Sequence, residues 1–100
     1  MLYQQGDVLI EKIEKAEGKK IPLKPLAEGE TTGHAHRIAV KDRENVSMFE
    51  LDEKLMMKVK APVEIEHEEH GTIAVPEGEY LIRKVREYDY FSEEAREVRD

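Results

Sequence analysis

The sequence contains no cysteine, which excludes disulfides, thiolate metal ligands and a cysteine nucleophile. It also lacks any run of the roughly 18 consecutive apolar residues that a membrane-spanning helix needs, so we do not expect an integral membrane protein. The N-terminal residues, MLYQQGDVLIEKIEK, carry acidic side chains and no small-residue cleavage site, unlike a secretory signal. We therefore expect a cytoplasmic protein.

Basic residues are fewer than acidic ones, 16 against 23, which gives a net charge of -7. Such a chain repels phosphate backbones unless its basic residues gather on one face, so nucleic acid is not an expected partner. The short basic cluster of Lys19, Lys20 and Lys24 has acidic neighbours and is interpreted as a solvated surface. Amides are scarce beside 18 Glu and 10 Lys, a bias typical of proteins that work at high temperature.

Apolar residues make up 39% of the 100 residues, enough for one small core and too many for a disordered acidic tail. Apolar and polar residues alternate with a period of two, which predicts strands over residues 6–13, 30–40, 47–51, 55–60, 63–67, 72–75 and 79–90. Prolines and a glycine make residues 16–25 a loop or an edge strand, and residues 41–45 are a polar turn. We expect an all-β fold, a small antiparallel barrel or sandwich forming one domain over residues 1–100, with a short C-terminal helix beginning near Ser92.

Two further patterns concern packing. The strands over residues 47–51 and 55–60 are expected to form a hairpin closed by Asp52, Glu53 and Lys54. Side chains expected to pack in the core include Met48, Met56, Met57, Tyr80 and Ile82.

The four histidines fall in two tight groups, His34-Ala35-His36 and His67-Glu68-Glu69-His70. Residues two apart in a strand project from the same face, so His34 and His36 lie side by side. Ile38 and Val40 share that parity, which predicts a buried face. His67 shares the parity of Val63 and Ile65 in the same way. Three histidines, His34, His36 and His67, are therefore expected to project from the same strand faces as the buried apolar residues.

Imidazoles gathered at the mouth of a small β-fold suit a divalent metal ion, namely Zn, Mn, Fe or Ni. His34, His36 and His67 are the first candidate ligands. His70 has the wrong strand parity, but a bend over residues 69–71 would bring it in, and either His70 or Glu69 would complete the ligand set. Two alternatives remain open: a hydrogen-bonded or pH-sensitive cluster without metal, and ordinary surface histidines.

An H-x-H pair, a later histidine and a P-x-G turn in a short β-rich chain resemble the cupin barrels. In cupins such histidines, together with a glutamate, hold a metal ion inside the barrel. The resemblance therefore implies a metal-binding β-barrel here. The chain departs from the cupin pattern because no glutamate follows His36 at the expected distance, and because Pro76-Glu77-Gly78 comes after His67 and His70.

A second resemblance spans nearly the whole chain and concerns an uncharacterised family of small bacterial, archaeal and phage proteins. Its motifs appear here as Gly6-Asp7-Val8, residues 28–36, the H-E-E-H segment at residues 67–70, residues 76–80 and Arg86-Glu87-Tyr88. This resemblance implies membership of that family and carries no assigned activity.

The leading hypothesis is a small metal-binding protein, with Glu68 or Glu69 moving protons if the metal site is catalytic on a small polar substrate. Arg86, beside Tyr88, would anchor an anionic group of that substrate, although a structural ion pair explains Arg86 equally well. The alternative hypothesis is a homo-oligomeric binding module without a metal, because a core this small gains from burying further surface.

Overall fold

The computed structural model describes residues 1–28 and 35–84. It consists of ten strands and one 3₁₀ helix: β1 (Leu2–Gln5), β2 (Val8–Ile13), β3 (Lys19–Ile21), β4 (Ala27–Glu28), β5 (Ala35–Ile38), η1 (Val40–Asn45), β6 (Val46–Leu51), β7 (Lys54–Val59), β8 (Val63–Glu66), β9 (Ile73–Val75) and β10 (Gly78–Lys84). The expected C-terminal helix lies outside the described residues. Within them, no helix is long and apolar enough to cross a membrane.

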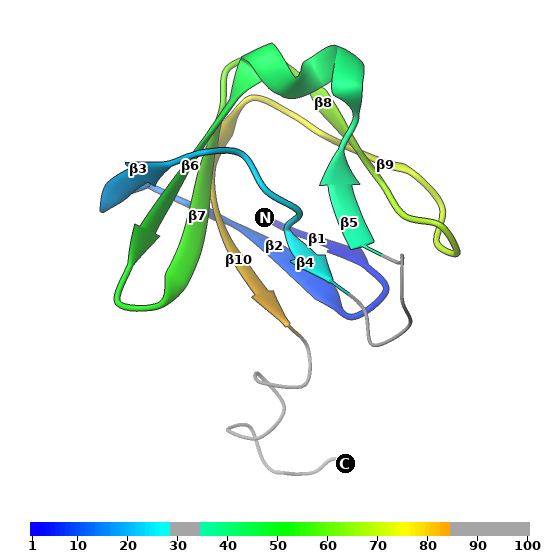
Figure 1. Ribbon diagram of the computed structural model, residues 1–100, viewed down its shortest axis with the longest axis horizontal. Coiled ribbons are helices and arrows are strands. Elements are labelled where there is room, and N and C mark those ends of the chain that lie inside the picture. Colours follow the sequence, from blue (N-terminus) through cyan, green and yellow to red (C-terminus); the bar gives the residue numbers. More distant parts are fainter. Residues whose placement is uncertain (29–34, 85–100) are drawn as a thin grey trace, which may run out of the picture.

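The strands form two antiparallel sheets (Figure 1). The larger sheet has the order β1-β2-β10-β7-β6-β3, and the smaller one has the order β4-β5-β8-β9. The all-β prediction is confirmed in its sandwich form, since the described strands do not close into a barrel. The connection through η1 carries the chain from β5 in one sheet to β6 in the other.

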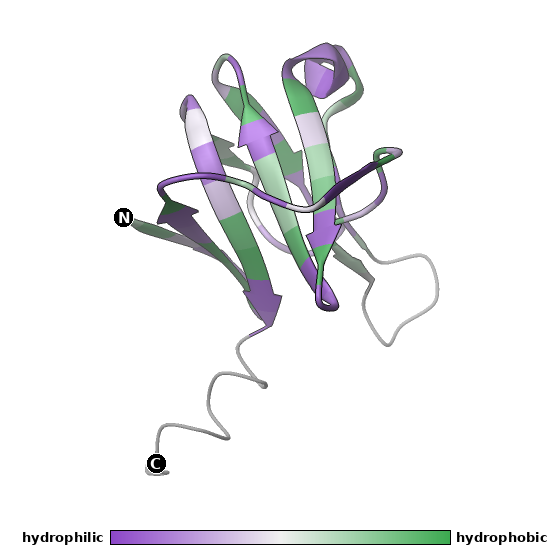
Figure 2. Ribbon diagram, turned by 90° about the vertical axis from the view of Figure 1, so that its left-hand side faces the viewer, coloured by the Kyte–Doolittle hydropathy of each residue, from purple (hydrophilic) through white to green (hydrophobic). Residues whose placement is uncertain are grey.

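The core lies between the two sheets. It takes side chains from both sheets, as the period-two pattern predicts: Val8, Ile10, Met48, Met57, Val59, Tyr80 and Ile82 from the larger sheet, and Ile38, Val63, Ile65 and Val75 from the smaller. Apolar and polar residues alternate along the strands of the larger sheet (Figure 2). The predicted core positions of the three methionines and of Tyr80 and Ile82 are confirmed, because all five are at most 8% exposed.

Two hairpins show how the turns are made. The predicted hairpin of β6 and β7 is confirmed, and Asp52 and Glu53 adopt positive φ angles of 52° and 66°, as a tight two-residue turn requires. At the N-terminus the prediction of one strand over residues 6–13 was wrong at its start. Gly6, with φ of 58°, turns the chain before β2, and the preceding residues form the separate strand β1.

The segment after β5 also differs from the expectation. Val40 was predicted to share the buried face of Ile38, but it is 75% exposed because the strand ends at Ile38 and η1 begins at Val40. The predicted polar turn over residues 41–45 is therefore part of a 3₁₀ helix. Asp42 fixes this helix to the smaller sheet, since its Oδ2 accepts the Glu64 N–H of β8 at 2.8 Å.

Gly18 provides a test of how tightly β3 lies against β6. Its φ is +112°, and a Cβ at this position would lie 2.2 Å from the backbone oxygen of Glu50. Gly18→Ala should therefore lower the free energy of unfolding by about 1–3 kcal/mol, measured by urea denaturation. Gly71→Ala is the matched control, because nothing lies within 4 Å of its added Cβ. Equal losses of unfolding free energy in the two variants would show that the backbone before β3 can move to accommodate the added methyl group.

Candidate functional site

Three of the four histidines come together at the end of the smaller sheet. His36 lies in β5, His67 directly follows β8, and His70 lies in the bend before β9. The ring centroids are 4.3 Å apart for His36 and His67, 4.6 Å for His67 and His70, and 6.0 Å for His36 and His70. The predicted approach of the two groups is thus present for these three. His34 lies outside the described residues.

Strand register explains why the two groups meet. Arg37 pairs with Glu66, and Ile38 pairs with Ile65, in the antiparallel ladder of β5 and β8. One step further along that register sets His36 opposite His67. The bend over residues 68–70 then turns the chain back toward β5, and His70 joins the group as the sequence analysis anticipated.

Gln5 fixes the orientation of the His36 ring from the opposite sheet. The Gln5 side chain is buried, and its Nε2 donates to the backbone oxygens of Ile65 at 2.8 Å and Gly71 at 2.9 Å. Its Oε1 consequently faces His36 Nδ1 at 2.8 Å. An amide oxygen only accepts, so Nδ1 of His36 carries the proton and the neutral ring keeps its lone pair on Nε2.

The turn between β1 and β2 forms another wall of the cluster. His36 Nε2 lies 3.4 Å from Asp7 Oδ1, and only 2% of the His36 side chain is exposed against 60% for Asp7. Gly6 lies against His70, because a Cβ on Gly6 would be 2.4 Å from His70 Nε2. Glycine at this position therefore leaves room for the His70 ring.

Sequence reasoning missed Gln5 and Asp7 as members of the site. Its prediction of one strand beginning at Gly6 excluded both the turn and β1. The only signal available was the Gly6-Asp7-Val8 motif of the resembling family, which gave no role for the aspartate.

Burial and neighbouring charge keep His36 neutral. Its pKa lies below the usual 6.5, chiefly because burial disfavours the charged ring and secondly because His67 is adjacent. The Asp7 carboxylate opposes this shift without reversing it. At neutral pH the lone pair of Nε2 is therefore available to an electrophile or a metal ion.

The imidazole rings stack beside one another. The planes of His36 and His70 differ by 11°, and the ring of His67 is tilted from them by 38° and 42°. His67 Nδ1 accepts the backbone N–H of Glu69 at 3.0 Å. With the rings in these positions, no group of three or more His, Asp or Glu side chains in residues 1–28 and 35–84 is arranged to hold a metal ion.

Glu68 fastens the histidine bend to β5. Its Oε1 accepts the Ala35 N–H at 2.9 Å, and its Oε2 pairs with Arg37 at 2.5 Å. These bonds, that with Arg37 foremost, lower the pKa of Glu68 to about 2. These two bonds give Glu68 a positioning role, and its part in proton transfer stays a prediction.

The other predicted site residues are placed as follows. Glu69 lies in the bend, and its backbone orients His67 as described above. Its proposed part in proton transfer stays a prediction. Arg86 and Tyr88, the predicted substrate-binding residues, lie outside the described residues.

Comparison with known proteins places this arrangement in a family. A family model described as a domain of unknown function (DUF8820) matches residues 4–85. No curated protein and no solved structure matches the chain. The match covers the histidine cluster and most of both sheets, and it agrees with the expectation of an uncharacterised family. The resemblance to cupins stays a prediction.

Replacing Gln5 tests the network that orients His36. Gln5→Met keeps the length of the side chain but leaves the oxygens of Ile65 and Gly71, and Nδ1 of His36, without this partner. We expect a loss of at least about 2 kcal/mol in the free energy of unfolding, measured in urea. Gln4→Met, at an exposed neighbour whose side chain donates to the Gly6 oxygen, should cost less than about 1 kcal/mol. Similar losses in both variants would refute a special role for Gln5.

The lowered pKa of His36 predicts that stability rises with pH. Between the folded pKa and the unfolded value of 6.5, the unfolded chain takes up a proton that the folded chain excludes. The contribution of His36 is therefore complete above pH 6.5 and declines as the pH falls toward the folded pKa. Urea unfolding in chelator-treated buffer at several pH values measures this slope. His36→Gln should flatten it in that window, and an unchanged slope would contradict the assignment.

Proposed function

Because the chain belongs to the DUF8820 family, whose description assigns no function, we propose its function from the geometry of the site. The proposed function is the binding of a divalent transition-metal ion by His36, His67 and His70, with Asp7 as a carboxylate ligand. The observation that carries the proposal is the Gln5 network, which turns Nε2 of the buried, neutral His36 toward Asp7.

The donor chemistry fits such an ion. Neutral imidazole nitrogens suit Zn, Fe and Ni, and a carboxylate oxygen beside them also suits Mn. A hydrogen bond from the second ring nitrogen to a fixed acceptor is the usual way in which proteins orient a histidine ligand. His36 has this bond to Gln5 at 2.8 Å.

The spacing of the rings is also suitable. Imidazoles that share one tetrahedral ion, with nitrogens about 2.1 Å from it, have centroids roughly 5 Å apart. The three centroid distances here lie between 4.3 and 6.0 Å. Binding therefore requires the half-buried His67 and the exposed His70 to turn their rings, while the backbone keeps its position. His67 would exchange its bond with the Glu69 N–H for the metal.

A metal ion bound by these groups would supply a Lewis acid that activates water or polarises a substrate oxygen. In this proposal the chain itself contributes three functions. Gln5 orients His36, Glu68 holds the bend against β5, and Glu69 is the proposed proton carrier beside the cluster. Arg86 and Tyr88 would bind a small polar substrate.

Metal content tests this proposal most directly. Untagged protein purified without chelator should contain about one divalent ion per chain by mass spectrometry, and chelated protein should take up one ion by calorimetry. His36→Gln, and the double variant His67→Gln/His70→Gln, should lose this ion. Asp7→Asn should bind it more weakly by roughly tenfold or more, whereas Asp52→Asn, in the exposed turn of the distant hairpin, is the matched control and should bind normally.

No uptake of Zn, Mn, Fe or Ni by the native protein would refute the metal proposal. Sedimentation of the same sample then tests the alternative hypothesis of a homo-oligomeric module. The observation that favours this alternative is the edge strand β1, which carries no charged residue and follows Met1, 78% exposed, with Leu2, 57% exposed. A monomer at micromolar concentration would refute it as well.

A further inference from the structure

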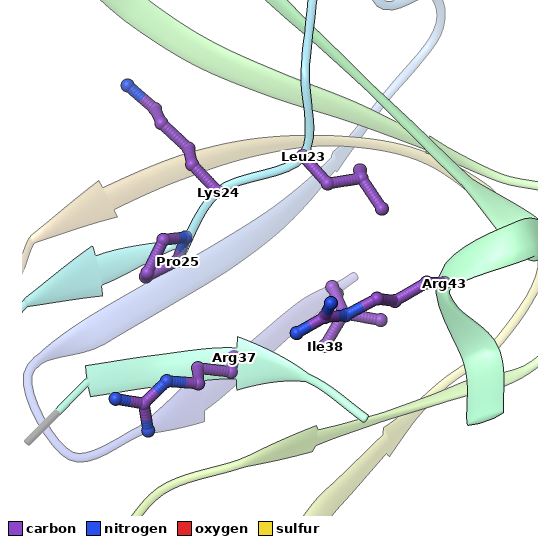
Figure 3. Close-up of a pocket in the computed structure, with 6 residues that line it drawn as sticks. All are labelled: Leu23, Lys24, Pro25, Arg37, Ile38 and Arg43. Atoms are coloured by element: carbon purple, nitrogen blue, oxygen red, sulfur yellow. The ribbon is translucent and has the colours of Figure 1, made fainter. Parts of the chain in front are cut away.

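A small pocket lies between the segment that precedes β4, the strand β5 and the helix η1 (Figure 3). Its volume is about 140 Å³, and it is lined by Leu23, Lys24, Pro25, Arg37, Ile38 and Arg43. None of the described histidines, His36, His67 and His70, lines it. The pocket is therefore separate from the proposed metal site and needs an explanation of its own.

The charge of this pocket is opposite to that of the chain. Among the described residues that line it, three are cationic and none is acidic, although the chain as a whole has a net charge of -7. The cations come from three separate segments of the sequence, so only the fold gathers them. Lys24, interpreted from the sequence as part of a solvated cluster with Lys19 and Lys20, is one of them.

Two of the cations have acidic partners that lie outside the pocket. Lys24 pairs with Glu50 at 3.0 Å, and Arg37 pairs with Glu68 at 2.5 Å. Arg43 differs, because no acidic side chain in the described part of the chain forms an ion pair with it. In Figure 3 its side chain extends from η1 toward β5. A guanidinium group without a carboxylate partner offers a planar pair of donors to an oxyanion.

The remaining walls of the pocket are apolar. Leu23, which is 37% exposed, Pro25 and the buried Ile38 line the pocket together with Arg43, and they offer contact to carbon atoms. A ligand that contacts both the Arg43 guanidinium and the apolar residues needs an anionic head and a short apolar body. A free inorganic ion would satisfy only the first part.

We propose that this pocket binds a small organic oxyanion, with its carboxylate or phosphate head on Arg43 and its apolar body against Leu23, Pro25 and Ile38. Arg37 and Lys24 lie at the rim, each paired with a glutamate outside the pocket. The pocket is distinct from the histidine cluster, because none of its described lining residues is a proposed metal ligand, although Arg37 also pairs with Glu68 of the histidine bend.

Titration of chelator-treated, isotope-labelled protein with benzoate and with phenyl phosphate tests this proposal by amide chemical shifts. Both probes carry an aromatic body, so their relative affinities identify the preferred head group. We expect saturable shifts confined to residues 23–25, 37–38 and 43–44. Neutral benzyl alcohol should cause no such saturable shifts, because it lacks the charge that Arg43 recognises.

Arg43→Gln should weaken binding of the better probe by at least about tenfold, because a charge-assisted bond is lost. The affinity of Arg43→Lys for this probe should lie between those of Arg43→Gln and the native protein, because lysine keeps the positive charge but lacks the paired N–H donors. Lys54→Gln removes the same charge at the exposed β6–β7 hairpin and should leave the affinity within about twofold. Arg43 is exposed, so the variants should keep the native amide spectrum.

The proposal is overturned if neither probe saturates, or if Arg43→Gln and Lys54→Gln bind equally well. Shifts of equal size with inorganic phosphate alone would also overturn it, since they would leave the apolar walls without a role. Because the titration is done without metal, its result is distinct from that of the metal-binding test.

Discussion

A buried amide holds the two sheets together at their polar end. Gln5 lies in β1 of the larger sheet, and its hydrogen bonds reach the backbone of Ile65 in β8 and of Gly71 before β9, both in or beside the smaller sheet. The apolar core supplies most of the attraction between the sheets but little directional preference. The Gln5 bonds add direction, and they fix the orientation of His36 at the same time. The geometry of the histidine cluster therefore depends on a residue from the other sheet.

Glu68 stabilises the same region from the solvent side. It fastens the bend that carries His67 and His70 to β5, through a hydrogen bond from the backbone N–H of Ala35 and an ion pair with Arg37. Gln5 acts on the buried side of the cluster and Glu68 on its exposed side. Gln5 thus orients His36, whereas the proposed metal binding would require the rings of His67 and His70 to turn.

The sequence was sufficient for those features that depend on local periodicity. The β6–β7 hairpin, the buried Met48 and Met57, and the parity of His36 follow from alternation. Met56, next to Met57 and on the opposite face, was expected to be buried because of its residue type. Features that depend on one backbone angle or on distant partners were not predictable in this way. Gly6 makes a turn where alternation suggests a continuous strand, and Val40 begins a 3₁₀ helix.

In the candidate site, too, the features set by local periodicity were predictable, whereas those set by distant partners were not. The closeness of His36, His67 and His70 could be anticipated, because two histidine groups on neighbouring strands meet through register. The contributions of Gln5 and Asp7 could not, since Gln5 lies 60 residues from Ile65 and 31 from His36 along the chain. Nothing in a single sequence marks a glutamine as the partner of a histidine so far away. The cationic pocket is hidden for the same reason.

The position of Gln5 on an edge strand has a kinetic consequence. β1 pairs only with β2 among the described strands, so it can detach while the other strands of both sheets stay paired. Its detachment removes Gln5 from Ile65, Gly71 and His36 in a single event, and carries the Gly6–Asp7 turn away from the cluster. Local opening of the N-terminal hairpin thus sets an upper limit on how long the cluster keeps its shape. The oriented cluster therefore lasts no longer than the docking of one peripheral strand.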